Sequence, residues 1–282
     1  MNKKFWALLL SLALCLSLAA CGGDSSDAAG SSDAEESAGE TAETVKLSVA
    51  ASPTPHAVIL EQCVPILAEQ GIELVVNEYS DYVVPNTAVE DGDEDANYFQ
   101  HIPYLDEFNE TRGTHLVSVA GVHIEPMGIY AGKTASIEEL ADGAVIAVPN
   151  DATNEGRALL LLEAQGLIKL DDSSNLTATP NNIVENPKNL EFQEVEAATI
   201  PSIRADVDLA VINSNYALGA GLDPTTDALV LESADSPYVN VLVVKEGNEE
   251  NPAVLALVEA LHSDAIRDFI TEEFDGAVVP AF

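Results

Sequence analysis

The segment Pro149–Arg157 contains the residue types best suited to hold an anion. It follows an apolar run typical of a buried strand and opens a helical stretch. Free N–H groups at a helix start attract anions, and a guanidinium in the first turn can hold a carboxylate by two hydrogen bonds. Arg157, one of only four arginines in the chain, is therefore a candidate carboxylate receptor. An ordinary helix capped by Asp151, Thr153 or Asn154, with Arg157 ion-paired at the surface, would show the same pattern.

Three aromatic side chains and a histidine lie within seven residues of one another. They are Tyr98, Phe99, His101 and Tyr104, close to a helix start. Grouped in this way they could form the wall of an apolar slot. A helix face packed into the core has the same composition, so both interpretations stay open.

Asparagines follow apolar runs that read as strands. Asn213 and Asn215 come after Leu209–Ile212, and Asn240 belongs to the segment Ser236–Asn240. Asparagine at the end of a strand usually forms part of a turn. Amide oxygens from two crossing segments could instead accept an ammonium without adding further charge.

The charge balance excludes several classes of partner. The 282 residues include 48 Asp and Glu against 11 Lys and Arg, for a formal charge of −37. Such a surface repels nucleic-acid phosphates and anionic lipid headgroups, so we expect no nucleic-acid partner. Five His and three Cys leave little room for a zinc cluster or a disulfide framework. With 47% hydrophobic residues the chain is globular, and its length allows two lobes.

The first twenty residues read as an export signal. Lys3 and Lys4 precede an apolar run from Phe5 to Ala20, which is short for a membrane span. Leu18-Ala19-Ala20-Cys21 resembles the lipobox of bacterial lipoproteins, in which the signal is cut before a cysteine whose sulfur carries diacylglycerol. We expect residues 1–20 to be removed and the lipid on Cys21 to anchor the protein at the extracytoplasmic face of the cell membrane.

Residues 21–45 read as the lipidated cysteine and a disordered acidic tether. From Gly22 to Thr44 there are seven Asp and Glu and no Lys or Arg. Such a stretch has no apolar face to bury, and its negative charges repel one another. The remaining cysteine, Cys63, has no disulfide partner left, so we expect a buried free thiol.

Short β-rich runs alternate with helical stretches after the tether. This alternation predicts an α/β fold with mostly parallel sheets covered on both faces. Strands are expected at 45–50, 72–76, 115–119, 144–148, 190–195, 209–212 and 238–244. Helices are expected at 55–70, 83–90, 98–112, 154–165 and 251–273.

Two segments, Val122–Lys133 and Tyr238–Lys245, are long enough to pass between lobes. A chain that leaves one lobe near Met127 and returns near Tyr238 forms two α/β lobes joined by a two-strand hinge. We therefore predict lobe 1 at residues 46–126 and 238–282 and lobe 2 at residues 127–237. Loops at the carboxyl ends of the strands would then face a shared ligand cleft.

Six segments, in this order along the chain, resemble the methionine-binding lipoproteins of the NlpA/MetQ type. They are Asp81–Asn86, Asp95–Leu105, Val148–Arg157, Val184–Leu190, Ala210–Asn213 and Ser236–Asn240. The resemblance runs from about residue 46 to the C-terminus. It implies a two-lobed, periplasmic-binding-protein-like fold and a substrate-binding lipoprotein. Such a protein delivers L-methionine to a membrane ABC permease with a cytoplasmic ATPase.

The resemblance also implies roles for particular residues. Arg157 would hold the α-carboxylate with support from Asn154, and Asn213 and Asn240 would hold the ammonium. The side-chain slot would be lined by Tyr82, Phe99, His101 and Tyr104. We expect a monomer with no catalytic residue, no cofactor and no metal.

One position departs from the resemblance and keeps alternatives open. Some family members have an aromatic residue just before the hinge proline, where this chain has Glu125 before Pro126. A carboxylate facing the cleft would favour a second cation or a bound water, and leaves room for D-methionine, a methionine-containing dipeptide or another amino acid.

Functions of other classes receive less support from the sequence. A metal-binding lipoprotein would use His101, His115 or His123 with carboxylates, but these histidines lack metal-ligand spacing. An enzyme is not supported, since the chain has no nucleophile elbow, Walker A loop or dinucleotide-binding fingerprint. A surface adhesin without a small ligand is the remaining alternative.

Overall fold

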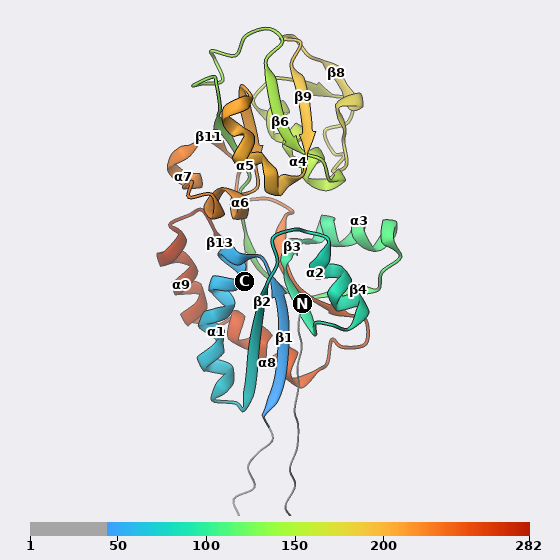
Figure 1. The fold of residues 1–282 in the computed structure, drawn as a ribbon, viewed down its shortest axis with the longest axis vertical. Coiled ribbons are helices and arrows are strands. Elements are labelled where there is room, and N and C mark those ends of the chain that lie inside the picture. The colour runs from blue at the N-terminus through green and yellow to red at the C-terminus, as the bar shows by residue number, and fades with distance from the viewer. Residues whose placement is uncertain (1–43) are drawn as a thin grey trace, which may run out of the picture. The chain divides into compact units, whose positions relative to one another are not determined.

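A computed structural model describes residues 44–282, which contain two large mixed β-sheets with helices on their faces (Figure 1). The expected signal peptide at 1–20, the lipidated Cys21 and nearly all of the tether at 21–45 lie outside the described residues. Between residues 44 and 282, no helix combines the length and the apolar character needed to cross a membrane.

The first sheet has six strands in the order β13-β4-β12-β3-β1-β2. Strand β1 pairs in parallel with β2 and β3, whereas β12 runs antiparallel to both β3 and β4. The expectation of mostly parallel sheets is therefore wrong, because β12 enters this sheet from the second one and runs in the opposite direction. The strands are β1 (Val45–Ala51), β2 (Ile72–Glu78), β3 (Ala96–His101), β4 (Leu116–Ile124), β12 (Val239–Lys245) and β13 (Val279–Pro280).

Successive side chains of β12 point into two separate helix layers. Leu242 and Val244 belong to a core with α1 (Val58–Ala68), α8 (Pro252–Leu261) and α9 (Asp264–Phe274). Val241 and Val243 pack on the opposite face, against α2 (Val84–Asp91) and α3 (Ile102–Arg112). The alternation of a strand thus buries both faces of this sheet.

Cys63 lies in the first of these cores. It is a free, fully buried cysteine, and burial raises the pKa of its thiol to about 12. The expectation of a buried free thiol is confirmed.

The second sheet has five strands in the order β11-β5-β10-β6-β9. Strand β6 is parallel to β9 and β10, whereas β5 is antiparallel to β10 and β11. Helix α4 (Ala152–Ala164) covers one face, and α5 (Ile200–Ile203) and α6 (Ser214–Gly219) cover the other. The strands are β5 (Gly128–Ala131), β6 (Val145–Pro149), β9 (Glu191–Val195), β10 (Leu209–Ile212) and β11 (Ala228–Leu231).

Smaller elements complete the second half of the chain. Strands β7 (Lys169–Leu170) and β8 (Ile183–Glu185) form a separate antiparallel ribbon, and α7 (Pro224–Asp227) precedes β11. Short helical turns lie at η1 (Pro53–Ala57), η2 (Pro180–Asn182), η3 (Ala197–Thr199) and η4 (Arg204–Asp206).

The chain crosses from the first large sheet to the second in the segment that joins β4 to β5. It crosses back in the segment that joins β11 to β12. The predicted passage at Tyr238–Lys245 is wrong, because Val239–Lys245 lies within the six-stranded sheet and the second connection precedes it. The lobe limits near residues 126 and 238 stay a prediction.

Two expected helices differ from those in the structure. The helix expected at 98–112 begins only at Ile102, because Ala96–His101 pairs with β1 and β12 in the interior of the sheet. The helix expected at 251–273 is interrupted, and Ser263 caps α9 by accepting the backbone N–H of Ile266. In the first case long-range strand pairing overrides local helix preference.

Candidate ligand-binding site

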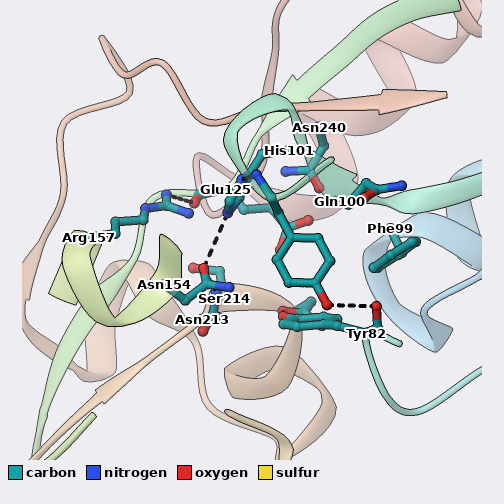
Figure 2. A pocket seen from close by; sticks show the side chains of 12 residues that line it. Tyr82, Phe99, Gln100, His101, Glu125, Asn154, Arg157, Asn213, Ser214 and Asn240 are labelled. Atoms are coloured by element: carbon teal, nitrogen blue, oxygen red, sulfur yellow. Dashed lines mark hydrogen bonds between the residues drawn. The ribbon is translucent and has the colours of Figure 1, made fainter. Parts of the chain in front are cut away.

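A pocket is lined by residues from both halves of the fold (Figure 2). All eight binding residues implied by the resemblance lie in its lining, although their contact with a ligand stays a prediction. The lining consists of Tyr82, Phe99, Gln100, His101, Tyr104, Glu125, Asn154, Arg157, Asn213, Ser214, Asn215 and Asn240.

The start of helix α4 is closed by its own cap. The carboxylate of Asp151 accepts the backbone N–H of Asn154 at 3.1 Å and its side-chain Nδ2 at 2.8 Å. Of the two interpretations left open for this helix start, the structure has the cap by Asp151, and an anion at the remaining N–H groups stays a prediction. Arg157 also lies in the second turn rather than the first, because the helix begins at Ala152.

Arg157 is buried and held in place on three sides. Its Nη2 donates to the carbonyl oxygen of Glu125 at 2.7 Å, and its Nε donates to Oε2 of Glu232 at 3.0 Å. Nη2 also pairs with the Glu232 carboxylate, and the ring of Tyr238 lies 4.2 Å from the guanidinium carbon. Nη1 makes no hydrogen bond to any part of residues 44–282, which leaves one edge of the guanidinium for a ligand.

Asp151 determines which way the neighbouring amides point. A carboxylate only accepts, so the Nδ2 of Asn154 faces it and the Oδ1 of Asn154 becomes an acceptor. That oxygen receives Nδ2 of Asn213 at 2.8 Å and Nε2 of His101 at 3.2 Å. The Oδ1 of Asn213 is consequently a buried acceptor with no donor among the described residues.

His101 is a neutral ring with its proton on Nε2. Its Nδ1 accepts the backbone N–H of Tyr104 at 3.2 Å, which caps α3, while Nε2 faces Asn154. Burial lowers the pKa of His101 to about 3. The ring therefore contributes hydrogen bonding rather than charge at neutral pH.

Three aromatic rings form an apolar wall beside these polar groups (Figure 2). The ring of Tyr82 lies 5.8 Å from that of Phe99 and 5.9 Å from that of Tyr104, centroid to centroid. The hydroxyl of Tyr104 donates to the carbonyl of Tyr82, and the hydroxyl of Tyr82 donates to Oδ1 of Asn215 at 2.6 Å. These bonds connect the wall to α6 of the second half.

Glu125 lies between the pocket and two buried histidines. Its Oε1 is 2.8 Å from Nε2 of His123 and 3.1 Å from Nε2 of His56. The Nε2 of His56 is also 3.0 Å from Oδ1 of Asn240, and Nδ1 of His123 bonds the hydroxyl of Tyr98. Burial lowers the pKa of His56 to about 4 and that of His123 to about 3, and it raises the pKa of Glu125.

The histidines named for a metal-binding alternative do not come together. His101 lines the pocket, and the exposed His115 pairs with Glu90 at 3.2 Å. Within residues 44–282, the side chains close enough to share a metal ion are His56, His123 and Glu125. Of the three histidines named for this alternative, His123 lies in this cluster, whereas His101 and His115 do not.

Several residues around the pocket escaped the sequence analysis. Gln100 donates to the side-chain oxygens of Asn86 and Asn97 at 2.6 and 2.9 Å, and Ser214 donates to the carbonyl of Pro126. Gln100 and Ser214 directly follow a predicted site residue, and this adjacency is the signal that could have found them. His56 had no comparable signal, because only the packing of its ring against Tyr98 and His123 brings it near Glu125.

The fold has two mixed sheets, each covered by helices, and a pocket lined by residues from both halves. This arrangement defines a two-lobed substrate-binding protein. The sequence profile of the NlpA lipoprotein family matches residues 47–282, and the chain belongs to this family. The predicted fold and the resemblance are both confirmed.

Similar proteins with known names agree with this assignment. The chain is 46% identical to the D-methionine-binding lipoprotein MetQ of Salmonella typhi over 74% of this chain and 78% of that protein. It is 44% identical to the methionine-binding lipoprotein MetQ of Bacillus subtilis, over 83% of this chain and 88% of that one. A nutrient-binding protein from Burkholderia cenocepacia, solved with bound methionine, is 43% identical with a TM-score of 0.80, covering 84% of this chain and 100% of that one.

Proposed function

We propose that this protein is a lipid-anchored, extracytoplasmic substrate-binding protein that captures L-methionine and delivers it to an ABC importer. The observation that carries the proposal is the pocket itself, which has unpaired polar groups at one end and aromatic rings at the other. The relatives named for methionine or D-methionine, and the relative solved with methionine, support this choice of ligand.

The polar end matches the two charges of an amino acid. Nη1 of Arg157 and Nδ2 of Asn240 have no acceptor among the described residues, so we assign them to the α-carboxylate. Asn154 supports this group by holding the start of α4 in place. The unpaired Oδ1 of Asn213 is assigned to the ammonium. We assign Asn240 to the carboxylate rather than to the ammonium, because its Oδ1 faces Nε2 of His56.

The aromatic end matches the side chain of methionine. Tyr82, Phe99 and Tyr104 provide ring faces and edges, and the neutral His101 adds no charge there. A thioether is polarisable and makes favourable contacts with aromatic edges.

We further propose that the protein catalyses no reaction and acts as a monomer. It would pass its ligand to a membrane permease that works with a cytoplasmic ATPase. Membership of a lipoprotein family and the lipobox-like Leu18–Cys21 support an anchor at Cys21.

Calorimetry of the mature chain tests the proposal. The protein is unfolded, refolded to remove any bound ligand, and titrated with L-methionine. We expect one-to-one binding that is lost in Arg157→Ala and Asn240→Ala and retained in Arg112→Ala, a surface arginine outside the pocket.

The same measurement decides between related ligands. A response to D-methionine or a methionyl dipeptide, with none to L-methionine, would keep the class of protein and change the ligand. No response to any of the three would contradict the proposed function.

A further inference from the structure

Glu125 is the acidic residue in the lining of a pocket that already has receptors for an amino acid. It is only 5% exposed, immediately precedes Pro126 and lines the cavity (Figure 2). Its Oε1 lies within hydrogen-bond distance of His123 and His56. The carboxylate also faces the backbone N–H of Asn215. A carboxylate accepts several hydrogen bonds, so it can accept a further one from a ligand.

Hydrogen bonds around His123 place the proton of this ring next to Glu125. The hydroxyl of Tyr98 lies against Nδ1 of His123, and Oε1 of Glu125 faces Nε2. A hydroxyl can donate or accept, whereas a carboxylate only accepts, so the proton of the neutral ring is on Nε2 and points at Glu125.

The same assignment holds for His56. Its Nδ1 is buried without a partner among the described residues, whereas Nε2 faces Oε1 of Glu125 and Oδ1 of Asn240. A proton on Nδ1 would leave a buried N–H unpaired, which costs about 1–3 kcal/mol. Both rings therefore donate to Glu125, which opposes the rise in the pKa of Glu125 that burial causes.

The charge of Arg157 acts on Glu125 and lowers its pKa, but no cation among the described residues forms an ion pair with it. Arg157 pairs with Glu232, and both histidines beside Glu125 are neutral. A ligand carboxylate at Nη1 of Arg157 places the rest of the zwitterion near Asn213 and Glu125, which line the same cavity. An ammonium has three N–H donors and supplies the missing positive charge.

We propose that Glu125, positioned by His56 and His123, accepts the α-ammonium of the ligand together with Asn213. The pocket then selects a zwitterionic amino acid over its α-hydroxy and deaminated analogues. An α-hydroxyl offers one neutral donor and leaves the buried carboxylate without a counter-charge. This inference rests on the proposed function and names the residue that sets its specificity.

A divalent metal is the competing occupant of the cluster of His56, His123 and Glu125. A histidine that binds a metal through one nitrogen almost always donates its other N–H to a partner. His123 has Tyr98 for this purpose, but Nδ1 of His56 has no acceptor among the described residues. The geometry therefore favours a ligand ammonium on the pocket side over a metal within the cluster.

Three ligands test the proposal by calorimetry on the refolded, EDTA-dialysed mature chain. They are L-methionine, its α-hydroxy analogue 2-hydroxy-4-(methylthio)butanoate, and 4-(methylthio)butanoate. We expect the wild-type protein to bind both analogues about 100-fold more weakly than L-methionine. In Glu125→Gln, L-methionine should bind about 10- to 100-fold more weakly while the analogues change much less.

Glu94→Gln is the matched control, because Glu94 is a buried carboxylate outside the pocket that accepts from Asn77 and Tyr79. Its methionine affinity should equal that of the wild type. The melting temperature of each variant without ligand reports whether it folds. Should Glu125→Gln not fold, similar wild-type affinities for the three ligands would still overturn the inference.

The other outcomes separate the two proposals. Unchanged methionine affinity in Glu125→Gln, or an equal loss for all three ligands, overturns the role of Glu125 and leaves the proposed function intact. Methionine binding that requires added Zn²⁺ overturns the inference in favour of a metal. Absence of methionine binding in the wild type contradicts the proposed function and this inference with it.

Discussion

Asn154 accepts a hydrogen bond from Asn213, 2.8 Å away, and this contact joins the start of α4 to the end of β10. Asp151 holds the other end of the Asn154 amide, so the direction of the whole chain of bonds is determined. The free end of that chain is the Oδ1 of Asn213. A capping carboxylate thus controls an acceptor in the pocket that it does not itself line.

Replacing Asn213 by alanine should weaken methionine binding about 10-fold, because an acceptor for a charged donor is lost. Calorimetry of Asn213→Ala measures the loss directly. Asn248→Ala, at an exposed asparagine outside the pocket, should bind as the wild type does. Wild-type affinity in Asn213→Ala would show that its Oδ1 does not contact the ligand.

Glu232→Gln should destabilise the ligand-free protein by about 2–4 kcal/mol, because it leaves the buried Arg157 without its counter-charge. A bound α-carboxylate replaces that charge, so methionine should raise the melting temperature of this variant more than that of the wild type. Thermal unfolding with and without methionine measures both effects. Glu185→Gln, which breaks an exposed pair with Lys169, should change neither. An equal or smaller methionine shift in Glu232→Gln would contradict the assignment of Arg157.

Glu155 should make stability fall with rising pH. Burial, with Glu194 and Asp151 nearby, raises the pKa of this carboxyl to about 7, and its Oε1 is buried without a donor among the described residues. A raised pKa favours the protonated form of the folded protein. Stability is therefore lost between the ordinary value near 4.5 and about 7.

Glu155→Gln removes this loss. The variant should match the wild type at low pH and exceed it by about 1–2 kcal/mol above pH 7, since water partly reaches the carboxyl. Denaturant unfolding across this pH range measures the difference, with the exposed Glu110→Gln as the control. A difference that does not grow with pH would refute the buried, protonated state.

Gly156→Ala should destabilise the fold by about 1–3 kcal/mol. A Cβ at this position would lie 2.3 Å from the backbone oxygen of Leu176, so α4 would have to move away from the loop that crosses it. Arg157 follows directly and would shift with the helix, so methionine affinity should fall as well. Gly219→Ala is the control, because its nearest neighbour would be a side-chain methyl at 3.9 Å. Equal stabilities for the two variants would contradict the close approach.

Local sequence patterns were sufficient for the α/β class, most strand positions and the family. The eight residues taken over from the motifs all line one pocket, because motifs at strand and helix ends keep their spacing when the fold forms. Asp151 could be recognised as a possible cap for a similar reason, since a cap acts on its own helix within three residues.

Tertiary structure determined the contacts between distant segments. The strand Ala96–His101 forms within a stretch read as helix, because its partners β1 and β12 stand on either side of it. Glu232 reaches Arg157 across 75 residues, and His56 reaches Asn240 across 184. Spacing along the chain cannot encode such pairs, because packing of buried sheets and helices brings them together and removal from water then sets their charges. The sequence therefore identified the residues of the site, whereas the fold determined which of their polar groups are paired and which are charged.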